Sequence, residues 1–335
     1  MTAAGSEPVR AAAPVRLDFA GGWTDVPPYS AREGGVVVSA AIALYARAEV
    51  RRGGDGIHLA AEDLDERLDL PDQQALSATG PLALLQAGLR LLPVGSCSLT
   101  TRSDVPRGSG LGSSGALDVA LVGALSAARA EPRSARELAD LACRLEGVEA
   151  GIPGGRQDQF AAAYGGVLRL GFRDPDATVD ALRLEPDFLA ELERRLLLVY
   201  TGASRFSGST IGRVMRAYEQ GNPQVADALH GLRAVAERMA EALAHGDLAG
   251  IGALLDANWR HQQALDPGMC TPLMARLGET MRRAGALGGK AAGAGAGGSM
   301  FFLCGDDPSP ARAAARAMGL TILPVRFAAE GVHRC

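Results

Sequence analysis

A glycine- and serine-rich loop over residues 106–116, PRGSGLGSSGA, constrains this chain more than any other segment. It contains four glycines and three serines, and an apolar stretch with helical periodicity follows it. Glycine backbone can approach an oxyanion closely and can take conformations that are closed to other residues. A helix after the loop would present free N–H groups and the positive end of its dipole to the same anion. The segment therefore predicts a phosphate-binding loop that leads into a helix.

Phosphate-binding loops differ in what surrounds them, so the sequence can be tested against each type. A Walker A loop requires a lysine directly after its second glycine, but the chain's one lysine is Lys290. The protein-kinase motifs HRD and DFG are absent from the sequence. Gly110, Gly112 and Gly115 do satisfy the GxGxxG pattern of dinucleotide-binding folds, after a predicted strand at 97–101. That fold also needs a second strand with an acidic end about twenty residues later, which the sequence does not offer. A dinucleotide site and a structural glycine turn are the weaker alternatives.

Composition and charge exclude several classes of partner. Hydrophobic residues make up 47% of the 335 residues and charged residues 21%, which is typical of a folded enzyme or binding protein. The net charge of −4, with arginines scattered among acids, argues against a nucleic-acid partner. No apolar run is suited to a signal peptide or a membrane span. The five cysteines show no CxxC pairing, so we expect buried free thiols, no zinc site and a reducing cytoplasm.

Apolar periodicity predicts a chain that begins with β-structure and continues with helices. The first half is expected to contain strands at 15–19, within 34–50 and at 165–170, a hairpin return over 56–70, and helices at 82–92, 114–129 and 134–150. Residues 173–187 are polar and contain proline, so we expect a linker there and a domain boundary near residue 193. The second half is expected to contain strands at 196–200, 300–304 and 320–326, and helices at 209–219, 224–245, 247–264 and 272–284. The predicted domains are 1–193 and 194–335.

Phosphoryl transfer needs a cation on the nucleotide phosphates, a group that orients or deprotonates the acceptor hydroxyl, and positive charge near the reacting oxygens. The hydroxyl of Ser113 or Ser114 and the carboxylate of Glu146 are candidate Mg²⁺ ligands, although Glu146 also fits an exposed helix face. Glycines and alanines flank Asp158 on both sides, where a substrate can approach closely. The same carboxylate, placed before an apolar segment, also fits a helix N-cap. The local pattern leaves both roles of Asp158 open.

Two further motifs accompany the loop. Residues 14–25 match PxRxxxxGxxTD, with nine positions from Arg16 to Asp25, residues 106–114 match PxxxGLGSS, and residues 293–298 match GAGxGG. With three motifs in this order, the chain resembles the GHMP kinases, a family of ATP-dependent small-molecule kinases, over nearly its full length. The resemblance implies an α+β fold of two domains, the first like domain 2 of ribosomal protein S5 and the second ferredoxin-like, with the site between them.

The resemblance also implies a role for each matched position. Asp158 matches the catalytic aspartate, which would accept the hydroxyl proton, and Arg16 matches the cation beside it. Ser114 and Glu146 match the magnesium ligands. ATP is expected to contact the loop residues Pro106, Gly108, Ser109, Gly110, Leu111, Gly112, Ser113 and Ser114. Substrate is expected to contact Gly22, Trp23, Thr24, Asp25, Gly155, Gly293 and Gly295.

Departures from the family pattern bear on the acceptor. Galactokinases carry a Glu-His pair where this chain has Gly22 and Trp23, which argues against galactose. The segments AGGWTD, GRQDQFAAAYGG and YTGASR are similar to fucokinases and kinases of heptose 7-phosphate, which phosphorylate an anomeric hydroxyl. An acceptor that already carries a phosphate would be bound by arginines, and Arg156 and Arg205 are the candidates, although each also fits an ordinary surface position. Trp23 either stacks on a sugar ring or on adenine, or belongs to the core.

The sequence thus predicts an ATP- and Mg²⁺-dependent kinase that phosphorylates a sugar or sugar phosphate, such as D-glycero-D-manno-heptose 7-phosphate, at C1. Fucose and a cyclitol of secondary metabolism are the alternative acceptors. A sensor that binds ATP and sugar without catalysis is an alternative class, but it would be expected to lack the aspartate, glutamate or serine, and all three are present. We expect a cytoplasmic monomer or homodimer that uses a small-molecule substrate and has no nucleic-acid or membrane partner.

Overall fold

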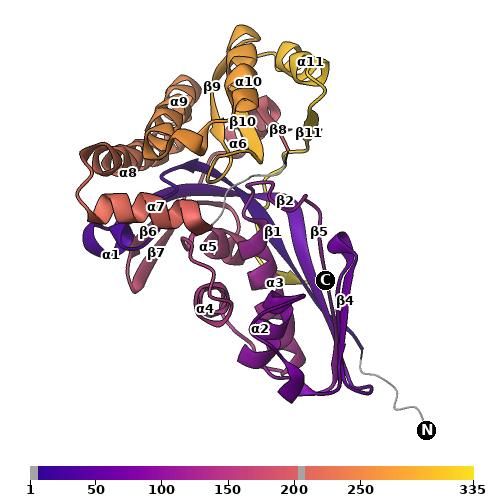
Figure 1. Cartoon of the computed structure of the whole chain (residues 1–335). Coiled ribbons are helices and arrows are strands. Elements are labelled where there is room, and N and C mark those ends of the chain that lie inside the picture. The colour runs from indigo at the N-terminus through magenta and orange to yellow at the C-terminus, as the bar shows by residue number, and fades with distance from the viewer. Residues whose placement is uncertain (1–6, 203–207) are drawn as a thin grey trace.

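Two β-sheets form the framework of the chain (Figure 1). The structure is a computed structural model that describes residues 7–202 and 208–335. The first sheet has eight strands and consists, in spatial order, of β12 (His333–Arg334), β1 (Val9–Ala20), β2 (Gly35–Arg52), β5 (Cys97–Ser103), β3 (Ile57–Ala61) and β4 (Glu66–Leu70), with β6 (Val167–Arg173) and β7 (Asp176–Ala181) added at β2. All of its pairs are antiparallel except β3 with β5. The long strand β2 serves both β5 and β6, because each pairs with a different half of it.

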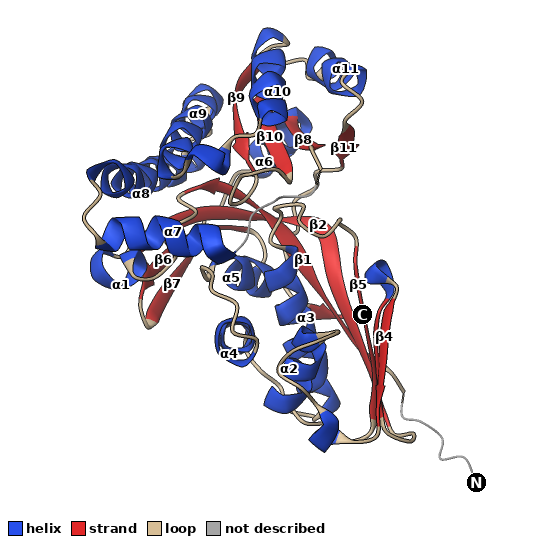
Figure 2. Ribbon diagram, viewed as in Figure 1, coloured by secondary structure: helices blue, strands red, loops and turns tan. Residues whose placement is uncertain are grey.

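Strand β1 crosses the middle of the molecule and is buried from Ala11 to Ala20. Helices lie on both sides of this part of the sheet (Figure 2). A strand covered on both faces is normally an uninterrupted apolar run. In β1 the run contains two charged residues, Arg16 and Asp18, which lie on one face because side chains alternate along a strand. Buried charges require partners, so these two positions mark the strand as more than a core element.

The helices of the first half pack on this sheet or on one another. They are α1 (Tyr29–Glu33), α2 (Ala83–Leu91), α3 (Ser113–Ala128), α4 (Ala135–Arg144) and α5 (Gln157–Tyr164), with short 3-10 turns at Glu62–Leu64 and Gln73–Ala75. Both α3 and α5 contact β1 and β2 directly, and α4 packs on both helices. A capping box of Ser134 and Glu137 starts α4, which continues into a π-helical turn at Leu145–Glu149. Such turns often place functional side chains.

The second sheet is antiparallel and has the order β11 (Thr321–Leu323), β8 (Leu196–Tyr200), β10 (Ser299–Cys304) and β9 (Ala286–Ala291). Its region also holds α6 (Pro186–Arg195), α7 (Gly208–Glu219), α8 (Pro223–Ala244), α9 (Leu248–Leu265), a 3-10 turn at Pro267–Met269, α10 (Pro272–Arg283) and α11 (Ser309–Ala317). Helices α8 and α9 contact β1 as well, on the side of the sheet away from α3. In the described part of the chain, no helix has the length and hydrophobicity that a membrane span requires.

One hydrophobic core joins the two sheets. The rings of Phe19 in β1 and Phe301 in β10 lie with their centroids 5.3 Å apart, and both belong to a buried cluster that also includes residues of α3 and α8. The end of the chain returns to the first sheet, where Phe327 bridges to Ile42 and β12 pairs with β1. The predicted α+β class is confirmed.

Most of the predicted elements are confirmed, with small shifts at their ends. The helix expected at 134–150 is α-helical only to Arg144 and π-helical beyond it. The linker expected at 173–187 is wrong, because β6 and β7 form a hairpin there and α6 begins at Pro186. Proline and aspartates marked a hairpin turn in this stretch, which uses the same residues as a linker. The division at residue 193 stays a prediction; that residue lies inside α6.

Candidate active site

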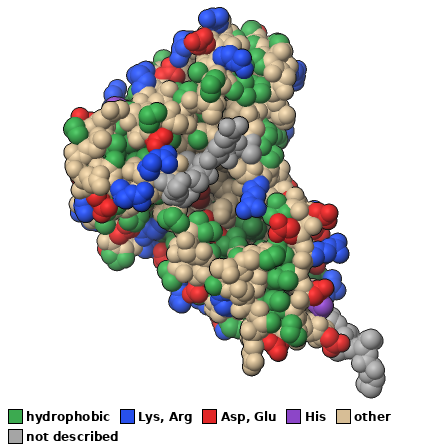
Figure 3. Space-filling model, in the orientation of Figure 1, with side chains coloured by type: hydrophobic (Ala, Val, Ile, Leu, Met, Phe, Trp, Pro, Cys, Tyr) green, Lys and Arg blue, Asp and Glu red, His purple; other side chains and the backbone are tan. Residues whose placement is uncertain are grey.

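A cleft of about 1430 Å³ brings the three motifs together. Its walls come from β1, the 106–116 loop, the start of α3, the segment before α5 and the turn after β9. The surface is hollowed at the middle of the face shown in Figure 3, where hydrophobic side chains line part of the hollow. Segments distant in sequence thus share one site, as the order of the motifs predicts.

The glycine-rich loop has the backbone geometry that the sequence predicts. Gly108, Gly110 and Gly112 have φ angles of 71°, 75° and 71°, in the left-handed region that glycine tolerates best. Gly112 caps α3, so the free N–H groups at the start of that helix lie at the cleft beside Ser113 and Ser114. This arrangement suits the phosphates of a nucleotide.

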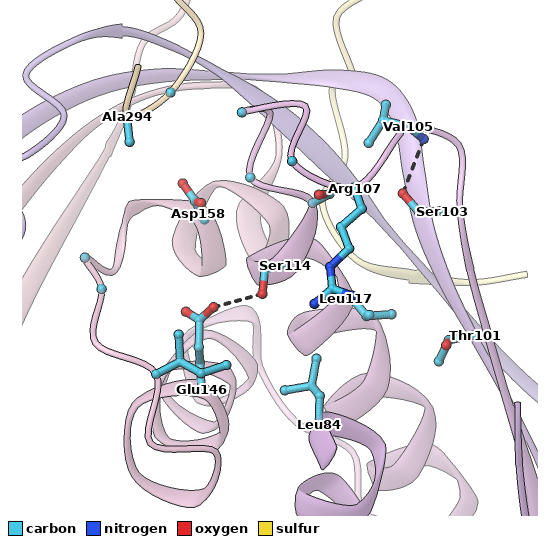
Figure 4. A pocket seen from close by; sticks show the side chains of 18 of the residues that line it. Leu84, Thr101, Ser103, Val105, Arg107, Ser114, Leu117, Glu146, Asp158 and Ala294 are labelled. Carbon is cyan, nitrogen blue, oxygen red and sulfur yellow. Dashed lines mark hydrogen bonds between the residues drawn. The ribbon is translucent and has the colours of Figure 1, made fainter. Parts of the chain in front are cut away.

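Three loop residues predicted to contact ATP do not line the cleft. Pro106 accepts a hydrogen bond from the Ser109 backbone N–H in a turn, at 3.1 Å. Ser109 and Leu111 are fully buried, and Leu111 belongs to the core. Their contribution is to hold the loop in shape, while Gly108, Gly110, Gly112, Ser113 and Ser114 form its inner surface. Leu84, Val105 and Leu117 supply apolar walls beside the loop (Figure 4).

Arg16, in the first motif, contacts the glycine-rich loop, Asp158, and the residue directly before the third motif. Its Nε donates to Oδ1 of Asp158 at 2.8 Å, and its Nη1 donates to the carbonyl oxygens of Gly110 at 2.8 Å and Ala292 at 3.0 Å. Its backbone N–H donates to the carbonyl of Leu111 at 2.9 Å. The guanidinium is always charged and has five donors in a fixed plane, so it fixes the carboxylate and the loop relative to each other.

Asp158 faces the cleft from the first turn of α5 (Figure 4). The N-cap of α5 is Arg156, so the alternative interpretation of Asp158 as an N-cap is wrong. The approach of α5 to α3 depends on small residues, because a Cβ on Gly115 would lie 2.5 Å from Cβ of Asp158. A Cβ on Gly112 would lie 3.0 Å from Cγ of the same residue. The loop glycines thus leave room for the carboxylate as well as for phosphate.

Ser114 and Glu146 meet at the other side of the loop, as Figure 4 shows. The Ser114 hydroxyl donates to Oε1 of Glu146 at 2.9 Å, and Nε2 of Gln159 donates to Oε2 at 2.6 Å. Burial raises the pKa of Glu146 above its ordinary value. No group of three or more His, Cys, Asp or Glu side chains that could enclose a metal occurs among residues 7–202 and 208–335. One hydroxyl and one carboxylate beside a phosphate site fit Mg²⁺, which keeps waters and phosphate oxygens among its ligands.

Asp25 also lines the cleft and is almost fully buried. It accepts hydrogen bonds from the backbone N–H of Gln157 at 3.0 Å and from Nε2 of Gln157 at 3.3 Å. Burial raises the pKa of Asp25 to about 6, with added repulsion from Asp158 and Asp18. Gly155 must be a glycine here, since a Cβ on it would lie 1.9 Å from Oδ2 of Asp25. Asp25 can therefore accept hydrogen bonds from substrate hydroxyls near neutral pH.

The remaining predicted substrate residues divide into two groups. Gly22, Trp23, Gly293 and Gly295 line the cleft. Trp23 is also buried in a cluster with residues of α7 and α8, which is the core position considered for it; its stacking on a sugar ring or on adenine stays a prediction. Thr24 does not line the cleft; its hydroxyl donates to the Gly21 carbonyl at 2.7 Å and accepts from the Val36 N–H at 3.1 Å. These bonds show a structural role for Thr24 in the turn after β1.

Of the two arginines predicted to bind a substrate phosphate, the structure describes only Arg156. Arg156 pairs with Asp174, donates to the carbonyls of Pro175 and Asp176, and lies over the ring of Phe172. It is absent from the residues that line the cleft, so its role in binding a substrate phosphate finds no support in the described part of the chain. Arg205 lies outside the described residues.

Sequence reasoning missed several polar residues of the site. Asp18 lines the cleft and pairs with Lys290. Gln157 donates hydrogen bonds to Asp25, and Gln159 donates one to Glu146. A charge at position 18 inside an apolar strand, and one lysine placed just before the third motif, were the available signals. The glutamines carried no signal of their own. Among the cysteines, all five are free thiols, but Cys335 is exposed, so the expectation that all would be buried is wrong.

The site combines a phosphate cradle, a carboxylate with an arginine beside it, and a second, buried carboxylate in the same cleft, which together define a phosphotransferase. Two family models match the chain: GHMP kinases N terminal domain over residues 78–166 and GHMP kinases C terminal over residues 239–321. The chain belongs to the GHMP kinases, and it is an ATP-using kinase with the two-domain fold of that family.

Its relatives include sugar kinases. The chain is 31% identical over 303 residues to the D-glycero-alpha-D-manno-heptose 7-phosphate kinase of Campylobacter jejuni, covering 88% of each protein. It is 29% identical to the bifunctional fucokinase/GDP-fucose pyrophosphorylase of Arabidopsis thaliana over 88% of its own length, and spans only 29% of that larger protein. A D-glycero-D-manno-heptose 1-phosphate kinase from Bacteroides thetaiotaomicron has a similar structure, with a TM-score of 0.79, 26% identity and 98% coverage of each chain.

Proposed function

We propose that this kinase transfers the γ-phosphoryl group of ATP to the anomeric C1 hydroxyl of a sugar or sugar phosphate, such as D-glycero-D-manno-heptose 7-phosphate. The observation that carries the proposal is the placement of Asp158 and Arg16 between the phosphate loop and Asp25 in one cleft. Relatives that act on heptose phosphates and on fucose support the sugar class.

Each residue of the site has a chemical task in this reaction. Asp158 accepts the proton of the attacking hydroxyl, and Arg16 offsets negative charge as the phosphoryl group moves. The start of α3 and the backbone of Gly108, Gly110 and Gly112 bind the phosphates. Ser114 and Glu146 would hold Mg²⁺, which neutralises charge on the phosphate oxygens when bound. Asp25 orients the sugar by accepting hydrogen bonds from its hydroxyls.

The acceptor alternatives are fucose and a cyclitol. The heptose phosphate needs a group that binds the distal phosphate. Arg156 is engaged elsewhere, so this choice depends on another cation, and Arg67 and Arg107 are further arginines that line the cleft. The sensor alternative is disfavoured, because Asp158, Glu146 and Ser114 are all present and line the same cleft. We also propose that the enzyme works in the cytoplasm as a monomer or homodimer, without nucleic-acid or membrane partners; sedimentation velocity tests the oligomeric state.

Coupled ADP release with Mg-ATP tests the function against heptose 7-phosphate, heptose, fucose, galactose, mevalonate and several cyclitols. Phosphorus NMR of the product then identifies the phosphorylated hydroxyl. A C1-phosphate from one sugar is the expected result, and the paired heptose and heptose 7-phosphate show whether a distal phosphate is required. ATP binding without turnover on any member would overturn the proposal in favour of a sensor.

A further inference from the structure

A buried ion pair lies beside the cleft. Lys290, the chain's one lysine, is fully buried in β9. Its Nζ lies 3.1 Å from Oδ2 of Asp18, donates to the backbone carbonyl of Asp18 at 2.5 Å, and lies 5.7 Å from the ring centroid of Phe301. The pair connects the second sheet to β1, two residues along the strand from Arg16. A chain with 33 arginines thus places its one ammonium group at this point.

Asp18 is not hidden behind the cleft but forms part of its lining, next to Gly22, Trp23 and Asp25. Its Oδ1 has one long hydrogen bond, from the Gly22 N–H at 3.4 Å. Gly22 leaves space for this carboxylate, since a Cβ there would lie 2.2 Å from Oδ2 of Asp18. A side chain at position 22 and the present position of Asp18 therefore exclude each other.

The wall around Asp18 is rich in hydrogen-bond acceptors. A carboxylate has about four acceptor positions, and the described residues fill only part of those on Asp18. Oε1 of Gln157 is buried without a hydrogen-bond partner among residues 7–202 and 208–335. The Nε2 of the same side chain donates to Asp25. Since buried polar groups are normally satisfied, these free acceptors call for a ligand with several O–H donors.

We propose that Asp18 is a specificity-determining residue that accepts hydrogen bonds from acceptor hydroxyls, and that Lys290 is a positioning residue that holds its carboxylate at the cleft wall. The inference rests on the proposed function and extends it, because it assigns polyol recognition to two carboxylates, Asp18 and Asp25. Breaking a buried ion pair is costly, whereas neutralising both partners together is far less so. This difference allows a binding role to be separated from a purely structural link between the sheets.

The test compares Asp18→Asn, which presents an amide donor where an acceptor stood, with the neutral double variant Asp18→Asn/Lys290→Met. Met281→Ala is the control for lost stability, because Met281 is buried in a cluster that does not line the cleft. For each protein we would measure urea unfolding, the dissociation constant of a non-hydrolysable Mg-ATP analogue, and KM and kcat for the acceptor found in the sugar panel. Monodeoxy forms of that acceptor are tested in parallel.

Both Asp18 variants are expected to raise the acceptor KM by about 10- to 100-fold, the range for a lost hydrogen bond to a charged group, with nucleotide affinity within about 2-fold of wild type. With wild type, one monodeoxy acceptor should have its KM raised by a similar factor. With Asp18→Asn, the KM of that deoxy acceptor should be little higher than the KM of the full acceptor. Unchanged acceptor KM in a folded variant, with lowered stability alone as in Met281→Ala, would overturn the role of Asp18 and leave the proposed function intact. A wild-type enzyme that phosphorylates no panel member would overturn the proposed function, and the role of Asp18 with it.

Discussion

The guanidinium of Arg16 holds Asp158 at 2.8 Å while the same side chain binds the carbonyl of Gly110 in the phosphate loop. The side chain of Arg16 is almost fully buried, whereas that of Asp158 is 28% exposed. The arginine is therefore the fixed member of the pair and the carboxylate is the member open to substrate. This asymmetry suits a base that must exchange a proton with a bound hydroxyl.

Replacement of Asp158 by Asn is expected to lower kcat by about 10³-fold, within the range for loss of a general base. Binding of a Mg-ATP analogue should remain within about 2-fold of wild type, because the phosphate loop and α3 are untouched. Steady-state kinetics and calorimetry measure the two effects. The exposed Asp187→Asn serves as the control and should change neither. Turnover near the wild-type value would remove Asp158 from the mechanism.

The pKa of Asp25, raised to about 6 by burial, predicts a pH dependence of acceptor binding. Below about pH 6 the carboxyl is protonated and loses acceptor capacity, so kcat/KM for the acceptor should fall as pH is lowered through this value. The Asp25→Asn variant should have a lower kcat/KM and lack this limb, while Asp187→Asn keeps it. A limb that persists in Asp25→Asn would belong to another group.

Asp118 is a buried carboxyl group that we expect to stay protonated in the folded protein, in contrast to Asp25. It is fully buried in α3 facing Gln159, and burial raises its pKa well above the ordinary value. The folded protein therefore keeps a proton that the unfolded chain releases above about pH 4, so this group's contribution to stability is largest at low pH and falls as pH rises towards the folded pKa. Asp118→Asn removes the effect, and its free energy of unfolding relative to wild type should rise by up to about 1.4 kcal/mol per pH unit in that window.

Urea unfolding of wild type and Asp118→Asn from pH 5 to pH 8 measures this difference. A constant difference across the range would show that Asp118 is ionised in the folded protein. Because both proteins share all other titrating groups, subtracting one curve from the other isolates position 118.

Gly293→Ala should impair the contact between the third motif and the phosphate loop. The added Cβ would lie 2.3 Å from the carbonyl oxygen of Gly110, and backbone on both sides leaves little room to adjust. We expect a loss of about 1–3 kcal/mol in the free energy of unfolding, as for overpacking, and weaker nucleotide binding. Gly278→Ala is the matched control, since its Cβ would meet open space within α10 and should stabilise the protein by up to about 1 kcal/mol. Equal effects of the two substitutions would contradict the packing argument.

Glu146→Gln should raise the Mg²⁺ concentration needed for half-maximal turnover by at least about 10-fold, if Glu146 is a ligand of the ion. Gln159→Leu should have a smaller effect in the same direction, because Gln159 acts only through its 2.6 Å bond to Glu146. Magnesium titrations at saturating ATP measure both. A Mg²⁺ requirement unchanged in Glu146→Gln would assign the ion to other residues.

Residues that recur in motifs could be predicted from sequence, whereas those chosen by tertiary geometry could not. The roles of Gly108, Gly110 and Gly112 could be predicted, because a phosphate-binding loop needs backbone conformations that glycine tolerates best. Thr24 lies within a motif, yet only the fold shows that its hydroxyl is used up in a turn. Likewise, the partner of Lys290 lies 272 positions away, and no local pattern predicts such a pairing.

Helical periodicity predicted the helices that have one apolar face, such as α4 and α10. Strand β9 was not predicted, because glycines interrupt its apolar pattern. The hairpin of β6 and β7 was predicted to be a linker, because the same polar residues and proline occur in turns and at domain boundaries. The π-helical turn that carries Glu146 was also invisible, since it differs from an α-helix only in its hydrogen bonds.

The pairing of β12 with β1 joins two strands that lie more than 300 residues apart in the chain. Ala11 must wait for Arg334, which at about 5–20 residues per second arrives roughly 15 to 60 s later. During translation the part of β1 that β12 later covers, Ala11 and Ala12, is therefore an open strand edge, and such edges pair readily with other chains. A nascent chain is thus open to mispairing at Ala11 and Ala12 until residue 334 has been made.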